Sequence, residues 1–158
     1  LFRSVTHSEG SITYNNFSSS EEIDPQKIYR HISIATPYME LIEEMTAFEF
    51  LNFHQTFKPL FEEIKKILEE VGLSNATHKQ IRYFSSGMKQ RLKLAQAFFS
   101  KTEILLLDEP CTNLDGAGIY LYHSLIEKHA GNRLVIVSSN DKIEHEFCKE
   151  KISIEDFK

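Results

Sequence analysis

The stretch Ile104-Leu105-Leu106-Leu107-Asp108-Glu109-Pro110 decides the fold. Its four consecutive apolar residues, without polar alternation, predict a strand buried on both faces, as in a parallel sheet covered by helices. Two carboxylates, Asp108 and Glu109, follow at the end of this strand. Ligands of parallel sheets gather at the carboxyl ends of the strands, so these two residues are the first candidates for chemistry.

Strand and helix patterns alternate around this stretch. Strands are predicted at 28–36, 103–107, 133–138 and 151–154, with a further short one beginning at Gly10. Helices are predicted at 116–129 and 141–148, and the apolar spacing is helical from 46 to 97. The predicted fold class is therefore α/β, a mostly parallel sheet with helices on both faces, interrupted by an all-helical insertion.

The last helix of the insertion is predicted at 87–99, with Ser85 or Ser86 as its N-cap. Its apolar face is expected to contain Met88, Leu92, Ala95, Phe98 and Phe99, and four polar residues are expected to face elsewhere, namely Lys89, Gln90, Lys93 and Gln96. The small residues Ser85, Ser86 and Gly87 let backbone N–H groups approach a phosphate, and the helix dipole favours an anion there. Without further context, the same turn is simply an N-cap.

Composition and charge exclude several classes of protein. The chain has 158 residues, 41% of them apolar and 26% charged, which is ordinary for one globular domain. A net charge of −5 argues against a protein that binds nucleic acid by bulk attraction. We expect no membrane span, because no run of about 18 apolar residues occurs. We also expect no signal peptide. The two cysteines and seven histidines lack metal-ligand spacing.

The paired carboxylates suit metal-dependent hydrolysis of a nucleotide. Asp108 can hold Mg²⁺, directly or through water, and Glu109 can orient or deprotonate the attacking water. Acidic residues are also common at strand ends because they favour turns, so the pair alone leaves a structural role open. The glycine-rich loop ending in Gly-Lys-Ser or Gly-Lys-Thr, which cradles phosphates, does not occur in the sequence.

Three motifs, in this order, resemble the nucleotide-binding domain of ABC transporters. Phe84-Ser85-Ser86-Gly87-Met88, continued by Lys89-Gln90-Arg91, resembles the signature motif Leu-Ser-Gly-Gly-Gln, 104–109 resembles the Walker B strand, and Leu114-Asp115 resembles a pair in the following loop. The resemblance implies a P-loop NTPase-like fold. It assigns 1–45 and 98–158 to a partial ATP-binding core that lacks the phosphate-loop strand, and 46–97 to a helical subdomain carrying the signature motif.

The resemblance also implies a role for each matched residue. Asp108 would serve the Mg²⁺ ion and Glu109 the hydrolytic water. The signature residues Ser85, Ser86, Gly87 and Met88 would meet the γ-phosphate of ATP held by the opposite subunit. Asp115 would lie at the interface between two such domains, and Asn140 falls at the position of the family's catalytic switch histidine.

Four departures from the family pattern qualify these roles. Ser86 replaces a glycine and Met88 replaces a glutamine, so Met88 cannot donate a hydrogen bond. Asn140 can donate a hydrogen bond but cannot carry a proton. The loop after 28–36 offers Pro37 or Tyr38 where relatives place a glutamine near the metal. The phosphate loop and the adenine-stacking aromatic residue are missing, so we expect an amino-terminally truncated copy that is inactive alone.

The leading interpretation is the ATP-hydrolysing subunit of an ABC transporter of the exporter type. ATP and Mg²⁺ would close it on a second nucleotide-binding domain, identical or different, and closure would drive a separate transmembrane permease subunit. The chain is thus expected in the cytoplasm, peripheral on the inner face of the cell membrane, without a nucleic-acid partner. Two alternatives stay open: a soluble ABC-type ATPase outside transport, and a non-catalytic regulatory half of a heterodimeric ATPase.

Overall fold

A three-stranded parallel sheet forms the centre of the protein. The computed structural model describes residues 13–15 and 22–157. Strand β2 (Ile104–Asp108) lies between β1 (Ile32–Ala35) and β3 (Leu134–Ser138), and both neighbours run parallel to it. The predicted parallel sheet with helices is confirmed, and the three strands end at the same edge of the sheet.

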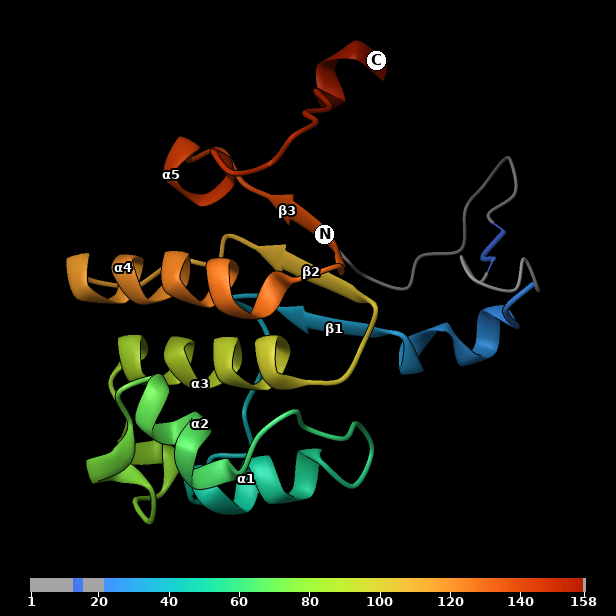
Figure 1. The fold of residues 1–158 in the computed structure, drawn as a ribbon. Helices are drawn as coiled ribbons and strands as arrows, with labels where there is room; N and C mark the ends of the chain where they lie inside the picture. Colours follow the sequence, from blue (N-terminus) through green and yellow to red (C-terminus); the bar gives the residue numbers. More distant parts are fainter. Residues whose placement is uncertain (1–12, 16–21, 158) are drawn as a thin grey trace.

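Five α-helices accompany the sheet in the described residues: α1 (Ala47–His54), α2 (Ile64–Glu70), α3 (Ser86–Phe99), α4 (Gly116–Leu125) and α5 (Lys142–His145). Figure 1 shows α3 and α4 side by side in front of the sheet, with α1 and α2 beneath α3. Helix α3 packs against β1 and β2 on one side and against α1 and α2 on the other. In the described part of the chain, every helix is too short or too polar to cross a membrane.

Several predicted boundaries differ from the structure. The strand expected at 28–36 begins only at Ile32, because Pro25–Arg30 is a 3₁₀ helix whose start is capped by Asp24. Proline has a fixed φ and suits this first helical position. The strand expected at 151–154 is wrong, since 154–157 forms another 3₁₀ turn. The strand predicted from Gly10 lies mostly outside the described residues. Of its described part, Asn15 forms an isolated bridge with Glu22.

The polar face predicted for α3 is also partly wrong. Gln90 is 2% exposed and Lys93 is 7% exposed, so both belong to the interior. Each has a polar partner there: Gln90 Nε2 donates to the carbonyl of Pro110, and Lys93 Nζ donates to that of Pro37. The helix is buried on more than its apolar side because it lies between the sheet and the other helices, a position that periodicity along one helix does not reveal.

The two faces of the sheet differ in how they are covered. Ser33, Ala35, Leu105 and Leu107 point to the covered face and are buried. On the opposite face, the register aligns Ile32 with Ile104 and Leu134, and Ile34 with Leu106 and Ile136. Leu134 is 58% exposed and Ile136 is 43% exposed. Within the described residues, the helices therefore cover one face and leave an apolar face open, whereas the sequence predicted helices on both faces.

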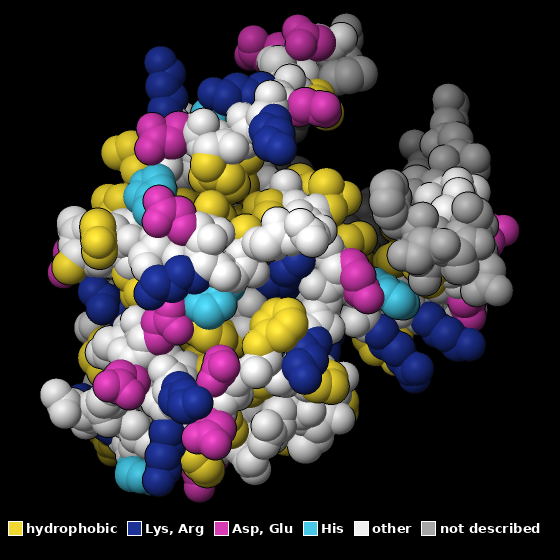
Figure 2. All heavy atoms as spheres, viewed as in Figure 1, with side chains coloured by type: hydrophobic (Ala, Val, Ile, Leu, Met, Phe, Trp, Pro, Cys, Tyr) yellow, Lys and Arg dark blue, Asp and Glu magenta, His cyan; other side chains and the backbone are white. Residues whose placement is uncertain are grey.

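Charged side chains of both signs are mixed on the surface of the helical half (Figure 2). Figure 2 shows Lys and Arg interspersed with Asp and Glu over the helical half of the molecule, without a patch of one sign on the face in view. Some of these charges pair locally, such as Lys66 with Glu62, four residues earlier, at 3.3 Å. Such exposed pairs contribute little stability and mainly keep the surface hydrated.

His54, the last residue of α1, is a partly buried titratable group in the helical half. Its Nε2 lies 2.8 Å from Ser100 Oγ, and the Ser100 hydroxyl itself donates to the carbonyl of Gln96. Because the proton of Ser100 is used on Gln96, the imidazole N–H is the donor to Ser100. Burial, and then the charge of Lys58, lower the pKa of His54 to about 4.

We expect the open apolar face to drive self-association of the 158-residue chain. The double substitution Leu134→Thr and Ile136→Thr should reduce it, because threonine suits a strand and removes apolar surface. Light scattering of the purified chain measures the effect. The control Val135→Thr, on the covered face, should lower the melting temperature without improving solubility. Equal scattering from the double variant and the unaltered chain would contradict the expectation.

Acid should destabilise the protein through His54. The unfolded chain, with the ordinary imidazole pKa of 6.5, binds a proton between pH 6.5 and 4 that the folded protein does not bind. The free energy of unfolding should therefore decrease as the pH is lowered from 6.5 to 4, by about 1 to 2 kcal/mol after allowance for partial exposure. Urea unfolding at several pH values measures the slope. His54→Gln should flatten it, and an unchanged slope in that variant would exclude His54 as the cause.

Candidate functional site

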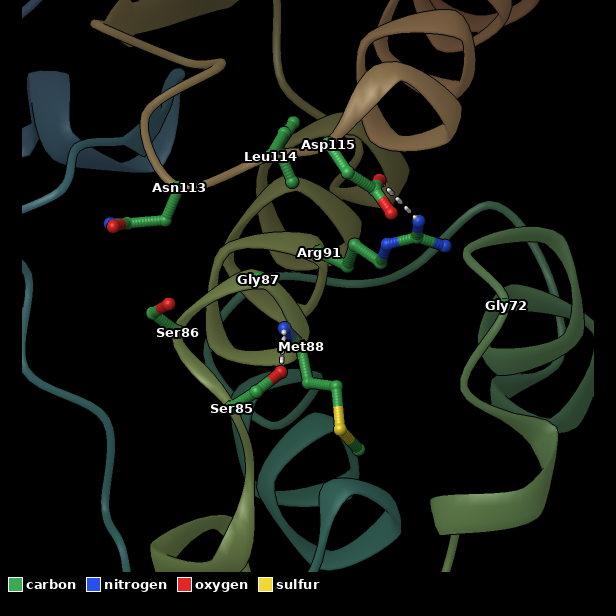
Figure 3. Close-up of a pocket in the computed structure, with 9 residues that line it drawn as sticks. All are labelled: Gly72, Ser85, Ser86, Gly87, Met88, Arg91, Asn113, Leu114 and Asp115. Atoms are coloured by element: carbon green, nitrogen blue, oxygen red, sulfur yellow. Dashed lines mark hydrogen bonds and ion pairs between the residues drawn. The ribbon is translucent and has the colours of Figure 1, made fainter.

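The start of α3 presents two exposed serines. Ser85 is the N-cap, and its side chain accepts a hydrogen bond from the backbone N–H of Met88 at 3.2 Å. Ser86 is the first helical residue, and its hydroxyl has no hydrogen-bond partner within the described residues. Figure 3 shows the Ser86 side chain directed away from the helix, on the same side as Asn113. The sequence prediction of a serine cap is confirmed, and the cap is Ser85.

A cavity of about 380 Å³ opens beside this helix start. Its lining comes from the end of α2, the start of α3 and the loop before α4: Gly72, Ser85, Ser86, Gly87, Met88, Arg91, Asn113, Leu114 and Asp115. The structure thus brings together five of the residues assigned to nucleotide binding, from two segments separate in sequence. Backbone N–H groups at a helix N-terminus and hydroxyl groups can all donate to an anion such as a phosphate.

Gly87 lets the two segments approach each other closely. A Cβ atom at this position would lie 3.1 Å from the carbonyl oxygen of Asn113, which is tighter than most such contacts. Asn113 itself has a φ of 65°, in the left-handed region that asparagine tolerates better than most residues. Packing therefore favours glycine at this position of the signature-like motif, because a side chain would press on the backbone of Asn113.

An ion pair closes the other side of the cavity. Arg91 Nη2 lies 3.4 Å from Asp115 Oδ1, and the same oxygen accepts the N–H of Gly118 at 2.8 Å, which makes Asp115 the N-cap of α4. The Gly118 N–H, and then the Arg91 charge, hold the pKa of Asp115 below its usual value. Gly72, with a φ of 71°, ends α2 and leaves room for the Arg91 guanidinium.

Asp108 and Glu109 lie elsewhere, at the carboxyl end of β2. Asp108 is 5% exposed, and its Oδ2 accepts a hydrogen bond from Thr36 Oγ1, at the end of β1, at 3.2 Å. Glu109 is exposed and has a φ of 43°, and its N–H donates to the carbonyl of Ser138 on β3. Neither carboxylate lines the cavity at α3. Glutamate rarely adopts positive φ, so its backbone is strained here.

Asn140 leaves the sheet from the same edge. It follows β3, whose last residue, Ser138, is the register partner of Asp108, and its side chain is exposed. The next residue, Asp141, caps the short helix α5 by accepting the N–H of Ile143 at 3.0 Å. The predicted site residues thus fall into two groups. Asp108, Glu109 and Asn140 lie at the sheet edge, and the others line the cavity.

The residues present fit a magnesium–nucleotide site. Among the described residues, no group of three or more His, Cys, Asp or Glu could hold a metal by itself. Mg²⁺ does not need such a cage, because it usually binds one or two carboxylates and takes its other ligands from water and substrate phosphates. Asp108, held in place by Thr36, meets this requirement.

Sequence reasoning missed three residues that support the site. Thr36 holds Asp108, Gln90 holds the carbonyl of Pro110, and Glu144 accepts the N–H of Cys111. Gln90 lies within the signature-like motif, and this position could have indicated that it supports the site. The helical pattern instead predicted that it faces away from the core. Thr36 and Glu144 carry no pattern of their own, because their partners are distant in sequence.

Comparison with known proteins connects this geometry with one family. The pattern of the family described as ABC transporter matches residues 1–112. The chain is 33% identical over 138 residues to the uncharacterized ABC transporter ATP-binding protein YybJ of Bacillus subtilis (85% of the chain, 62% of the relative). It is 38% identical over 116 residues to YxlF of the same organism, described in the same words (70% and 39%). The chain therefore spans less than two thirds of the length of these relatives.

Solved structures agree on the fold. A structure described as the ATP binding subunit of an ABC transporter superposes with a TM-score of 0.66 at 24% identity, covering 78% of this chain and 54% of that one. A putative ABC transporter ATP-binding protein from Pyrococcus furiosus superposes with a TM-score of 0.61 at 17% identity, covering 77% and 64%. At these identities the likeness supports the fold alone.

Substitution of the two serines should affect the free energy of unfolding differently. Ser85→Ala should lower the free energy of unfolding by about 1 kcal/mol, because the cap on α3 is lost. Ser86→Ala should change it by less than about 0.5 kcal/mol, since its exposed hydroxyl has no intramolecular partner in the described structure. Urea unfolding of both variants measures the difference. Ser85→Thr is the matched control that keeps a capping oxygen, and equal losses in the two alanine variants would be contrary to this assignment.

Proposed function

The chain belongs to the ABC transporter family, among its ATP-binding proteins, and on this premise we propose that it hydrolyses ATP as the energy-coupling subunit of a transporter. Members of this family generally bind and hydrolyse ATP. The observation that carries the proposal is the cavity at α3, where Ser85, Ser86 and Gly87 meet the loop ending in Asp115.

The exposure of this cavity supports a site completed by a second domain. Ser85, Ser86 and Asp115 are exposed and the cavity opens outward, so a nucleotide held by another domain could reach it. The N-terminus of α3 has no acidic residue in its first turn, which leaves its dipole free to favour the phosphates. We therefore assign Ser85, Ser86, Gly87 and Met88 to the γ-phosphate of ATP bound by a second nucleotide-binding domain, and Asp115 to the interface with that domain.

The sheet edge supplies the second half of the proposal. Mg²⁺, bound with ATP, neutralises charge on the phosphates, and Asp108 is the residue that would hold it. Thr36 orients the Asp108 carboxylate through its hydrogen bond. Glu109, exposed at the same strand end, would accept a proton from the attacking water. Asn140 would donate a hydrogen bond from its amide to a phosphate oxygen.

We propose a partner surface on the other side of α3. A second cavity, of about 300 Å³, is lined by Met39, Glu40, Leu41, Glu43, Lys89 and Lys93. Beside it in sequence, Tyr38 is 82% exposed. Lys89 forms an ion pair with Glu43, and Lys93 holds the carbonyl of Pro37, so the rim of this cavity is ordered. We assign this surface to a transmembrane permease subunit, which would keep the protein at the inner face of the cell membrane.

Two departures from the family pattern favour a second candidate, the non-catalytic regulatory half of a heterodimeric ATPase. Met88 takes a position where relatives carry a hydrogen-bonding glutamine, and Asn140 cannot carry a proton. Both departures weaken contacts to the phosphates while the two carboxylates remain. A heterodimer in which this chain binds ATP and its partner hydrolyses it would show such a pattern.

ATP turnover of the full-length protein tests the proposed function. Glu109→Gln should lower kcat by about 100-fold or more, because the amide cannot accept the proton from water, while ATP binding persists. Glu103→Gln is the matched control, since Glu103 is exposed at the opposite end of β2, next to His31. Unchanged kcat in Glu109→Gln would refute the catalytic role of Glu109 and favour the regulatory candidate.

A further inference from the structure

One peptide group in the loop between β2 and α4 is held at both ends by buried side chains. The carbonyl oxygen of Pro110 accepts a hydrogen bond from Gln90 Nε2 at 2.8 Å. The N–H of Cys111, the other end of the same peptide group, donates to Glu144 Oε1 at 2.7 Å. Gln90 belongs to α3 and Glu144 to α5, so two elements distant in sequence grip one peptide plane. We call Gln90 and Glu144 the peptide clamp.

Both clamp residues are placed where polar groups are costly. Gln90 is 2% exposed and Glu144 is 4% exposed. The second carboxylate oxygen of Glu144, Oε2, has no hydrogen-bond partner among the described residues. An apolar side chain of similar size would avoid the cost of removing this carboxylate from water. Stability of the core therefore does not explain why a glutamate occupies the position.

Glu144 is itself held in position. The hydroxyl of Tyr122, on α4, donates to the backbone carbonyl of Glu144 at 2.7 Å, and Tyr122 is fully buried. This bond fixes the backbone from which the Glu144 side chain extends, and so limits where its carboxylate can lie. Burial, followed by the charges of Glu144 and Asp141, raises the pKa of the Cys111 thiol to about 12, so the thiol beside the clamp stays neutral.

The clamp adjoins a strained residue. Glu109, one residue before the clamped peptide group, has a φ of 43°. A non-glycine residue in this region is strained and persists only where the surroundings hold it there. On one side, the N–H of Glu109 is bonded to Ser138 on β3. On the other side, the clamp fixes the orientation of the chain immediately after Pro110.

We propose that Gln90 and Glu144 are positioning residues that keep Glu109 in its strained conformation and so aim its carboxylate at the reacting water. This inference rests on the proposed function of Glu109. The clamp also joins three parts of the site, because Gln90 lies on the helix of the cavity, Glu144 follows Asn140, and the clamped loop continues to Asp115. Movement of α3 or α5 is transmitted to Glu109 through one peptide group.

Apolar replacement of each clamp residue in the full-length protein tests the proposal. Gln90→Met and Glu144→Met keep similar volume and remove the hydrogen bond. Each should lower kcat by about 10- to 100-fold with the KM for ATP changed by less than about threefold, since the base is displaced and binding is not. The double variant should be little worse than either single variant, because both act on the same peptide group.

A second readout does not depend on turnover. Amide hydrogen exchange of Cys111 should become faster in Glu144→Met, while exchange in the middle of α3 stays unchanged. Glu144→Gln keeps an acceptor for the Cys111 N–H and should recover most of the turnover lost in Glu144→Met. Glu146→Met, an exposed neighbour on the same segment, is the matched control.

The outcomes separate the clamp from the proposed function. If Glu109→Gln abolishes turnover but both clamp variants keep the unaltered kcat, the clamp proposal is wrong and the function stands. Independent, multiplicative losses in the double variant would also overturn it. If the unaltered protein does not hydrolyse ATP, the proposed function fails, and the exchange of Cys111 decides: faster exchange supports the clamp, and unchanged exchange overturns it. If Glu144→Met does not fold, Gln90→Met tests the other end of the same peptide group.

Discussion

Parallel pairing of β2 with a strand on each side is the constraint from which the rest of the site follows. Because the three strands run in one direction, their carboxyl ends meet at one edge and bring together residues far apart in sequence, Thr36, Asp108 and Ser138. The Thr36 hydroxyl reaches the Asp108 carboxylate only in this register. The same pairing lets Ser138 accept the N–H of Glu109 and so supports a backbone conformation that an isolated strand end would not keep.

The loop that follows β2 connects this edge with the cavity at α3. It begins at Glu109, passes through the peptide group gripped by Gln90 and Glu144, and ends at Asp115, the cap of α4. Along its course the backbone of Asn113 comes close to Gly87. The loop is therefore bonded to the sheet, to α3 and to α5 along a few residues. A site of this kind can respond as one unit, because a shift of either helix changes the same short segment.

The sequence predicted the parts of the molecule that depend on local pattern. The apolar run before Asp108 predicted a buried parallel strand, and the serine turn predicted the start of α3, because both signals lie within a few residues. The short last strand was wrong, since strand formation depends on a partner that 151–154 does not find in the described structure. Packing between distant segments buries Gln90 and Lys93 and brings Thr36 and Glu144 to their partners. The apolar periodicity of one helix does not predict such contacts.

The position of the metal tests the central claim most directly. Mn²⁺ can replace Mg²⁺ in a crystal structure of the full-length protein with ATP, and its anomalous scattering locates it. We expect the manganese peak beside the Asp108 carboxylate, bound directly or through one water, at the edge of the sheet where Thr36 follows β1 and Ser138 ends β3. A manganese–ATP complex bound away from this edge, with Asp108 touching neither the metal nor its waters, would contradict the assignment.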